Sequence, residues 1–267
     1  MERSLSPWLR AFFLLVTVQA LVVAAGVVWP ALIPRLLPWD ASPLNARFIA
    51  ALYAMGALSA LLCLVAGRYA EARITLIEIG LVTLLLLLIT LTRLGEFVAP
   101  RAFPIGWLLS YTADPLLAAL LLWRMRGHDR APAGASPLAP VLIAYAAALG
   151  VIGLVLLALP GLAVRIWPWE LPEVLGQLYS AFFLGMAACA ALAAREPRWA
   201  GVRIYAIANL FLIVLVLVVS LLHIERFRAG PATLIWFGFC LVAAAGFARI
   251  LLGRTSRSVL VAAVRDG

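Results

Sequence analysis

Long apolar stretches follow one another along the whole chain, and none of them alternates apolar and polar residues with the two-residue period of a strand. A helix needs about 20 mostly apolar residues to cross roughly 30 Å of hydrocarbon, and these stretches are long enough. They lie at roughly 10–29, 47–66, 74–92, 103–124, 140–160, 174–194, 204–222 and 233–252. The pattern therefore predicts an all-α integral membrane bundle of eight transmembrane helices.

The two halves of the chain repeat one another with an offset of 130 residues. Pro30, Arg35, Pro38, Trp39 and Asp40 recur as Pro160, Arg165, Pro168, Trp169 and Glu170, and Arg68, Ala70, Arg73 and Ile74 recur as Arg198, Ala200, Arg203 and Ile204. Four spans per repeat, an even number, bring both repeats into the membrane in the same direction. We therefore expect two parallel four-helix repeats, residues 1–126 and 138–267, joined by a cytoplasmic linker at 127–137 that is rich in Gly, Ala and Pro.

The composition supports a membrane protein, and the distribution of charge predicts its orientation in the membrane. The chain is 66% apolar with a mean hydropathy of +1.08, and all 21 of its basic residues are arginine. Seven of them fall on the side of the membrane away from the termini: Arg35, Arg47, Arg93, Arg101, Arg165, Arg226 and Arg228. The other fourteen share a side with both termini, which predicts a bacterial inner-membrane protein with cytoplasmic N- and C-termini. The net charge of +9 then indicates anionic lipid, and no nucleic acid, as its partner.

Several local patterns predict how the helices pack. Gly56 with Ala60, and Gly185 with Cys189, predict close helix contacts through small residues. Six tryptophans near the predicted outer helix ends predict an interfacial belt: Trp29, Trp39, Trp107, Trp167, Trp169 and Trp236. The Pro-Trp-acid loops are interpreted as rigid turns, with a docking surface for a partner's outer domain as the alternative.

The sequence lacks the patterns of several enzyme classes. It contains no Cys-x-x-Cys, no His-Glu-x-x-His, no glycine-rich phosphate loop and no Gly-x-Ser-x-Gly elbow. Its two histidines, His128 and His223, fall at opposite ends of the spans and form no pair for a haem. Cys63, Cys189 and Cys240 stand singly inside helices and are expected in the core. We therefore expect no enzyme, no cofactor and no metal site.

Polar residues inside the predicted spans are unevenly shared between the repeats, and three in the first repeat are singled out: Asp114, Gln19 and Glu78. Their counterparts 130 residues later are Ala244, Leu149 and Ala208. An ionisable group costs several kcal/mol at the bilayer centre, so these three form the candidate intramembrane polar site. For Glu78, contact with the membrane interface or with an arginine there is the alternative.

Asp114 precedes Pro115, and an Asp-Pro pair is typical of the first turn of a helix. Because proline removes a backbone donor, we expect the fourth helix to be broken or kinked at this point. Broken helices at mid-membrane depth build binding sites in transporters, but a capping Asp can also be purely structural.

The duplicated four-helix units, with their Pro-Trp-acid outer loops and Arg-x-Ala-x-x-Arg inner loops, resemble an uncharacterised family of bacterial polytopic membrane proteins. The resemblance covers most of the chain and implies the fold but no activity. Two functions then compete. The first is a non-catalytic structural or accessory membrane subunit, with a membrane-protein partner or a second copy of itself, indicated by the nearly apolar second half and the short loops. The alternative is a small-solute or proton-coupled transporter, and it requires Asp114, Gln19 and Glu78 to face one cavity.

Overall fold

The computed structural model describes residues 4–96, 104–127, 134, 136 and 138–265. Within these residues the chain is helical and contains no β-strand, only two isolated bridges. The predicted all-α class is therefore confirmed. Arg3, Phe97, Arg101, His128, Arg130 and most of the predicted 127–137 linker lie outside the described residues.

Eight helices are long and apolar enough to cross a membrane, which confirms the eight predicted spans. They are α1 (Pro7–Ala24), α3 (Pro43–Ala66), α4 (Tyr69–Thr92), α5 (Pro104–Arg124), α6 (Ala139–Ala158), α8 (Glu173–Ala194), α9 (Trp199–Leu222) and α10 (Pro231–Arg265). Two short helices, α2 (Ile33–Leu36) and α7 (Pro160–Ile166), follow the first helix of each half. Single 3₁₀ turns lie at Ala25–Val27, Pro30–Leu32, Leu94–Glu96 and Ile224–Arg226.

Local chemistry explains where several helices begin and end. Ser6 and Ser42 cap α1 and α3, because each side-chain oxygen accepts a hydrogen bond from the backbone amide three residues later. A proline follows each serine at the first helical position, where its missing amide costs nothing. Gly67, with a φ of 67°, ends α3 in the left-handed conformation that favours glycine.

Four helices form the centre of the bundle and four surround it. In the spans of α3, α4, α8 and α9 more than half of the residues are buried, against a third or fewer in α1, α5, α6 and α10. The same pairs recur in the two halves: α1 packs on α3 as α6 packs on α8, and α5 packs on α4 as α10 packs on α9. Between the halves α3 packs on α9 and α4 on α8. These pairs agree with the sequence repeat, and superposition of the halves as parallel units stays a prediction.

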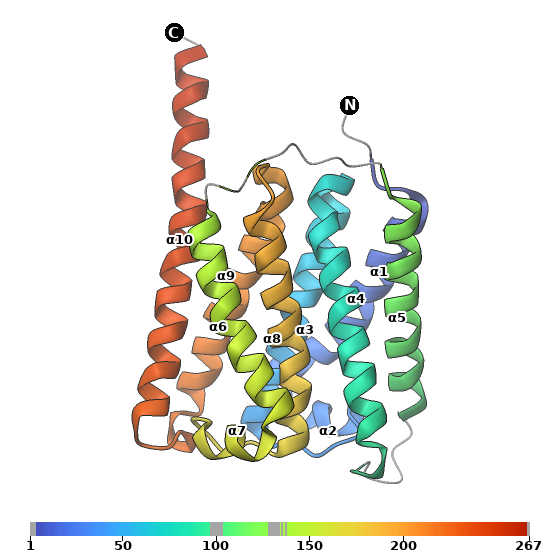
Figure 1. Ribbon diagram of the computed structural model, residues 1–267, viewed down its shortest axis with the longest axis vertical. Coiled ribbons are helices and arrows are strands. Elements are labelled where there is room, and N and C mark those ends of the chain that lie inside the picture. The colour runs from blue at the N-terminus through green and yellow to red at the C-terminus, as the bar shows by residue number, and fades with distance from the viewer. Residues whose placement is uncertain (1–3, 97–103, 128–133, 135, 137, 266–267) are drawn as a thin grey trace.

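Chain ends and short helices lie at opposite ends of the bundle. Helix α1 begins and α10 ends at the same end, whereas α2 and α7 lie together at the other end (Figure 1). This arrangement follows from an even number of crossings. We refer to the two ends below as the terminal end and the α2/α7 end.

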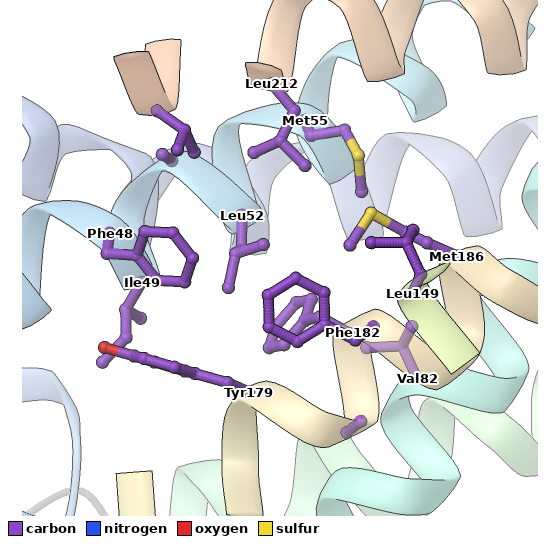
Figure 2. Close-up of a cluster of buried hydrophobic side chains, with 14 of the residues drawn as sticks. Phe48, Ile49, Leu52, Met55, Val82, Leu149, Tyr179, Phe182, Met186 and Leu212 are labelled. Carbon is purple, nitrogen blue, oxygen red and sulfur yellow. The ribbon is translucent and has the colours of Figure 1, made fainter. Parts of the chain in front are cut away.

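The core between the halves is built from apolar side chains of α3, α4, α6, α8 and α9 (Figure 2). Met55 and Met186 point toward one another across this core. At Gly185 an added Cβ would lie 2.4 Å from Val82 Cγ2, so α8 approaches α4 as closely as a glycine permits. The predicted close packing is thus correct at Gly185. It is wrong at Gly56, where an added Cβ would meet nothing within 4 Å.

Most of the predicted tryptophan belt is wrong, because the indoles point inward. Trp39 and Trp169 are each 1% exposed, and Trp107, Trp167 and Trp236 are also buried. Only Trp29, at 53%, is exposed among the six. The prolines of each loop return the chain over the α2/α7 end of the bundle, where Trp169 Nε1 donates to Asn45 Oδ1 at 2.8 Å. Such a buried partner replaces the headgroup contact that a belt tryptophan would make.

Candidate functional site

A cavity of about 370 Å³ lies inside the first half of the chain. Side chains of α1, α3, α4 and α5 form its walls, and Leu36 and Leu37 line it near the α2/α7 end. From the second half, Phe182 of α8 lines it. The volume falls within the range of about 300–1,000 Å³ that is typical of small-molecule sites.

All three predicted polar residues line this one cavity. Gln19 comes from α1, Glu78 from α4 and Asp114 from α5, so three helices bring together residues that are far apart in the sequence. Glu78 is 7% exposed and Asp114 is 4% exposed. Among the described residues, Glu78 Oε1 and Asp114 Oδ1 have no hydrogen-bond partner. Each carboxyl group therefore has a free oxygen in a largely apolar space.

The cavity wall carries acidic groups but no basic ones. Among the described residues, neither an arginine nor a histidine lines it. Within the same part of the chain, the contact between Glu78 and an arginine that was considered from the sequence does not form. Two arginines of the terminal end pair with other acids. Arg203 Nη2 lies 2.6 Å from Glu71 Oε2, and Arg73 Nη2 lies 3.8 Å from Glu196 Oε2. A carboxylate without a countercharge in such a place needs a proton or a cation to neutralise it.

The fourth span is not broken at Pro115, because α5 is one helix from Pro104 to Arg124 with the proline inside it, and the kink expected as the other possibility stays a prediction. Packing against α4 explains the continuity. An added Cβ at Gly80 would lie only 3.0 Å from Ala118 Cβ, so the two helices are in close contact one turn beyond the proline. Helix–helix contact thus outweighs the local cost of the missing amide. Asp114 consequently caps no helix, and it lines the cavity instead.

Aromatic residues surround the part of the cavity near the α2/α7 end. The hydroxyl groups of Tyr53 and Tyr111 are hydrogen-bonded to each other. The ring of Trp107 lies 4.3 Å from that of Tyr111, centroid to centroid, and its Nε1 donates to Thr90 Oγ1 at 3.2 Å. Ser59 and Thr83 also line the wall, but their hydroxyls donate to carbonyls of their own helices. Among the buried side-chain atoms of the described wall residues, Glu78 Oε1 and Asp114 Oδ1 are thus the ones without a hydrogen-bond partner.

The aromatic and small residues of the site were missed by sequence reasoning, although the repeat contains a signal for them. Tyr53 and Tyr111 correspond to Phe183 and Leu241, which lack hydroxyls. Small wall residues correspond to large buried ones in the second half: Gly56 to Met186, Thr75 to Tyr205 and Gly106 to Trp236. A comparison of side-chain volume between the halves would have located the cavity in the first.

The cysteines and Asn209 lie within spans and have structural surroundings. Cys63, Cys189 and Cys240 are buried free thiols, as predicted. In the part of the chain that the structure describes, no three His, Cys, Asp or Glu side chains gather to hold a metal ion. Asn209 accepts a hydrogen bond from Tyr145 OH at 3.1 Å and so joins α9 to α6.

The fold defines a multi-pass α-helical membrane protein with an internal, partly acidic cavity. Compared with protein-family models, curated proteins and solved structures, the chain has no match.

Proposed function

We propose that the protein is a small-solute membrane transporter and that the cavity of the first half is its substrate site. One observation carries the proposal: Gln19, Glu78 and Asp114, from three different helices, line a single cavity within the membrane-spanning region. Intramembrane carboxyl groups mark solute and proton pathways in many transporters. Because Glu78 and Asp114 can each take up a proton, coupling to proton movement is part of the proposal.

The competing role, a non-catalytic accessory subunit, does not account for the cavity. Unless a solute or lipid fills it, a cavity of about 370 Å³ leaves the side chains of its wall without packing contacts. Two buried carboxyl groups with a free oxygen each would add a further desolvation cost. A scaffold needs neither feature, whereas a solute site needs both. Purification from native membranes with a stoichiometric partner protein, and no solute movement, would instead favour the subunit.

We also propose a location in a bacterial inner membrane with both termini in the cytoplasm. The support is the distribution of arginines, fourteen of which fall on the side of the termini. The terminal end would then face the cytoplasm, and α2 and α7 would face outward. Lipid is the expected surrounding of the outer helices, and the proposal involves no nucleic acid.

Access to the cavity from both sides of the membrane tests the transporter. Gly56 lines the cavity and leaves open space around an added Cβ, so Gly56→Cys introduces a thiol there with little disturbance. The variant is made with the three native cysteines replaced by alanine. Sealed right-side-out and inside-out vesicles are then treated with a membrane-impermeant methanethiosulfonate, and alkylation of the remaining thiol is measured.

We expect the reagent to modify Gly56→Cys from either face. Gly238→Cys is the matched control, because Gly238 also leaves open space for a Cβ but lies on an exposed face of α10. That thiol would face lipid and should stay unmodified. Modification of Gly56→Cys from neither face would contradict the transporter, because a bound solute could then not be released into water.

A further inference from the structure

We propose that the substrate of the cavity is a hydrophobic organic cation that enters from the bilayer between α1 and α5. This inference rests on the transporter proposed above and names the substrate class. It is carried by three features of the cavity: its charge, its apolar and aromatic wall, and the place where it reaches the molecular surface.

The charged residues of the cavity wall determine whether a ligand should be a cation or an anion. In the part of the chain that the structure describes, the wall contains two acids, Glu78 and Asp114, and no arginine or histidine. Each acid has an oxygen without a hydrogen-bond partner among the described residues. A bound anion would face both carboxylates without compensation, whereas a bound cation neutralises them in a medium of low dielectric constant. The amide of Gln19 adds a neutral hydrogen-bonding group to the same space.

The rest of the wall fits an apolar body. Most lining residues are aliphatic or aromatic, and Leu52, Met55 and Phe182 are examples on the side of the bundle core. Trp107 and Tyr111 add aromatic rings close to each other on α5. Ring faces attract organic cations, and this attraction is strongest where water is excluded. A small hydrated ion would leave most of this wall without contacts.

Exposure of the lining residues shows where the cavity reaches the surface. Val18 and Val22 of α1 belong to the wall but are 54% and 48% exposed, and Ser110 of α5 is half-buried. Helices α1 and α5 lie together at one edge of the bundle (Figure 1), but α1 packs mainly on α3 and α5 mainly on α4. The opening therefore lies between α1 and α5.

The surface around this opening is one that faces lipid. Leu21 beside Val22 and Leu109 beside Ser110 are exposed apolar residues. Val18 lies six residues before the end of α1 at Ala24, which is about 9 Å along the helix axis and within the hydrocarbon region. A solute that passes here comes from the bilayer, so it has to be soluble in lipid.

Binding of tetraphenylphosphonium to the purified full chain tests the charge. Tetraphenylborate has nearly the same shape and the opposite charge, so it controls for hydrophobic binding. We expect equilibrium dialysis to detect the cation and to give at least tenfold weaker binding of the borate. Asp114→Asn and Glu78→Gln preserve side-chain shape and should each weaken binding of the cation by about tenfold or more. Glu225→Gln, at an exposed carboxylate outside the cavity, should leave binding unchanged.

Equal binding of the two ions, or full binding of the cation by both carboxamide variants, would overturn the inference. If either variant fails to fold, the comparison of the two ions on the unaltered protein still tests whether the site prefers a cation. Modification of Gly56→Cys from both faces without binding of the cation would refute the substrate class and leave the transporter standing. Failure of the thiol to react from either face would refute the transporter itself.

The opening is tested separately with the protein in lipid vesicles. Val22→Trp places an indole at the opening, and Leu21→Trp is the matched control because Leu21 is similarly exposed but does not line the cavity. We expect Val22→Trp to slow association of tetraphenylphosphonium by fivefold or more, whereas Leu21→Trp does not. Equal association rates in the two variants would refute a passage between α1 and α5.

Discussion

Single polar residues join the two halves of the bundle at its ends. At the α2/α7 end, Arg47 Nη1 of α3 lies 2.6 Å from His223 Nε2 at the end of α9. Burial of the imidazole and the positive charge of Arg47 hold the pKa of His223 below its ordinary value of 6.5, while Glu225 acts in the opposite direction. The neutral ring can therefore accept a hydrogen bond from the guanidinium near pH 7.

We expect this contact to make stability depend on pH. Because the folded state lowers the pKa of His223, the contribution is fully present above pH 6.5 and is lost as the pH falls from there through the lowered pKa. The melting temperature in detergent should thus fall between pH 7.5 and pH 5.5. In His223→Gln this decrease should be smaller, and an unchanged decrease would assign it to other groups.

At the terminal end, Glu71 joins the halves. Its carboxylate is 1% exposed and contacts Arg68 of its own half at 3.0 Å and Arg203 of the other half at 2.6 Å. We predict that Glu71→Ala lowers the free energy of unfolding by about 1–3 kcal/mol, since it removes two charge-assisted hydrogen bonds. Arg203→Ala should cost less, because Arg68 remains to pair with the acid. Chemical denaturation in detergent measures both changes, and an equal cost for the two variants would argue against this account.

At the scale of elements, two glycines that look alike in the sequence have opposite surroundings. Gly185 lies against Val82, whereas Gly56 lines the cavity with open space around it. We predict that Gly185→Ala costs about 1–3 kcal/mol, because the added methyl group forces α8 and α4 apart. Gly56→Ala should be neutral or slightly stabilising, since alanine favours the helix. Thermal unfolding of the two variants compares them, and a similar loss in both would be inconsistent with this packing.

The helices also differ in how far their features could be predicted from the sequence. Hydropathy located all eight spans, because the length and composition of a membrane helix are local properties. The break at Pro115 and the belt position of Trp39 and Trp169 were predicted wrongly, because contacts between helices decide both. Asp114, Gln19 and Glu78 could be selected because polar residues are rare in apolar spans. Tyr53 and Tyr111 are compatible with a membrane helix and gave no such signal by themselves.

At the scale of the whole molecule, orientation follows from the arginine distribution and can be tested at exposed serines. Ser42 lies at the α2/α7 end and Ser4 at the terminal end, close to Arg68. In intact cells lacking an outer-membrane barrier, an impermeant maleimide should label Ser42→Cys and spare Ser4→Cys. Both variants carry alanine at the three native cysteines. Labelling of Ser42→Cys only after the inner face has been opened would reverse the orientation.

The two halves share one helix order, but the interior of the second half is filled by side chains whereas the first half contains the cavity. Met186 and Leu149 fill the interior of the second half, whereas their counterparts Gly56 and Gln19 line the cavity of the first. Gly56→Met therefore places in the first half the side chain that fills the corresponding position of the second half. The new side chain enters open space, and it buries apolar surface that the present chain leaves in contact with the cavity.

We predict that Gly56→Met stabilises the protein and abolishes binding of tetraphenylphosphonium. Part of the gain comes from replacing glycine within a helix, and Gly238→Met measures that part, because both glycines lie in long helices with open space around them. Beyond this control we expect about 1–2 kcal/mol from apolar burial. Higher stability together with loss of binding is expected if the cavity serves to bind a ligand, because filling it improves packing and removes the site. If Gly56→Met bound the cation as well as the unaltered protein, the ligand would have to bind outside this cavity.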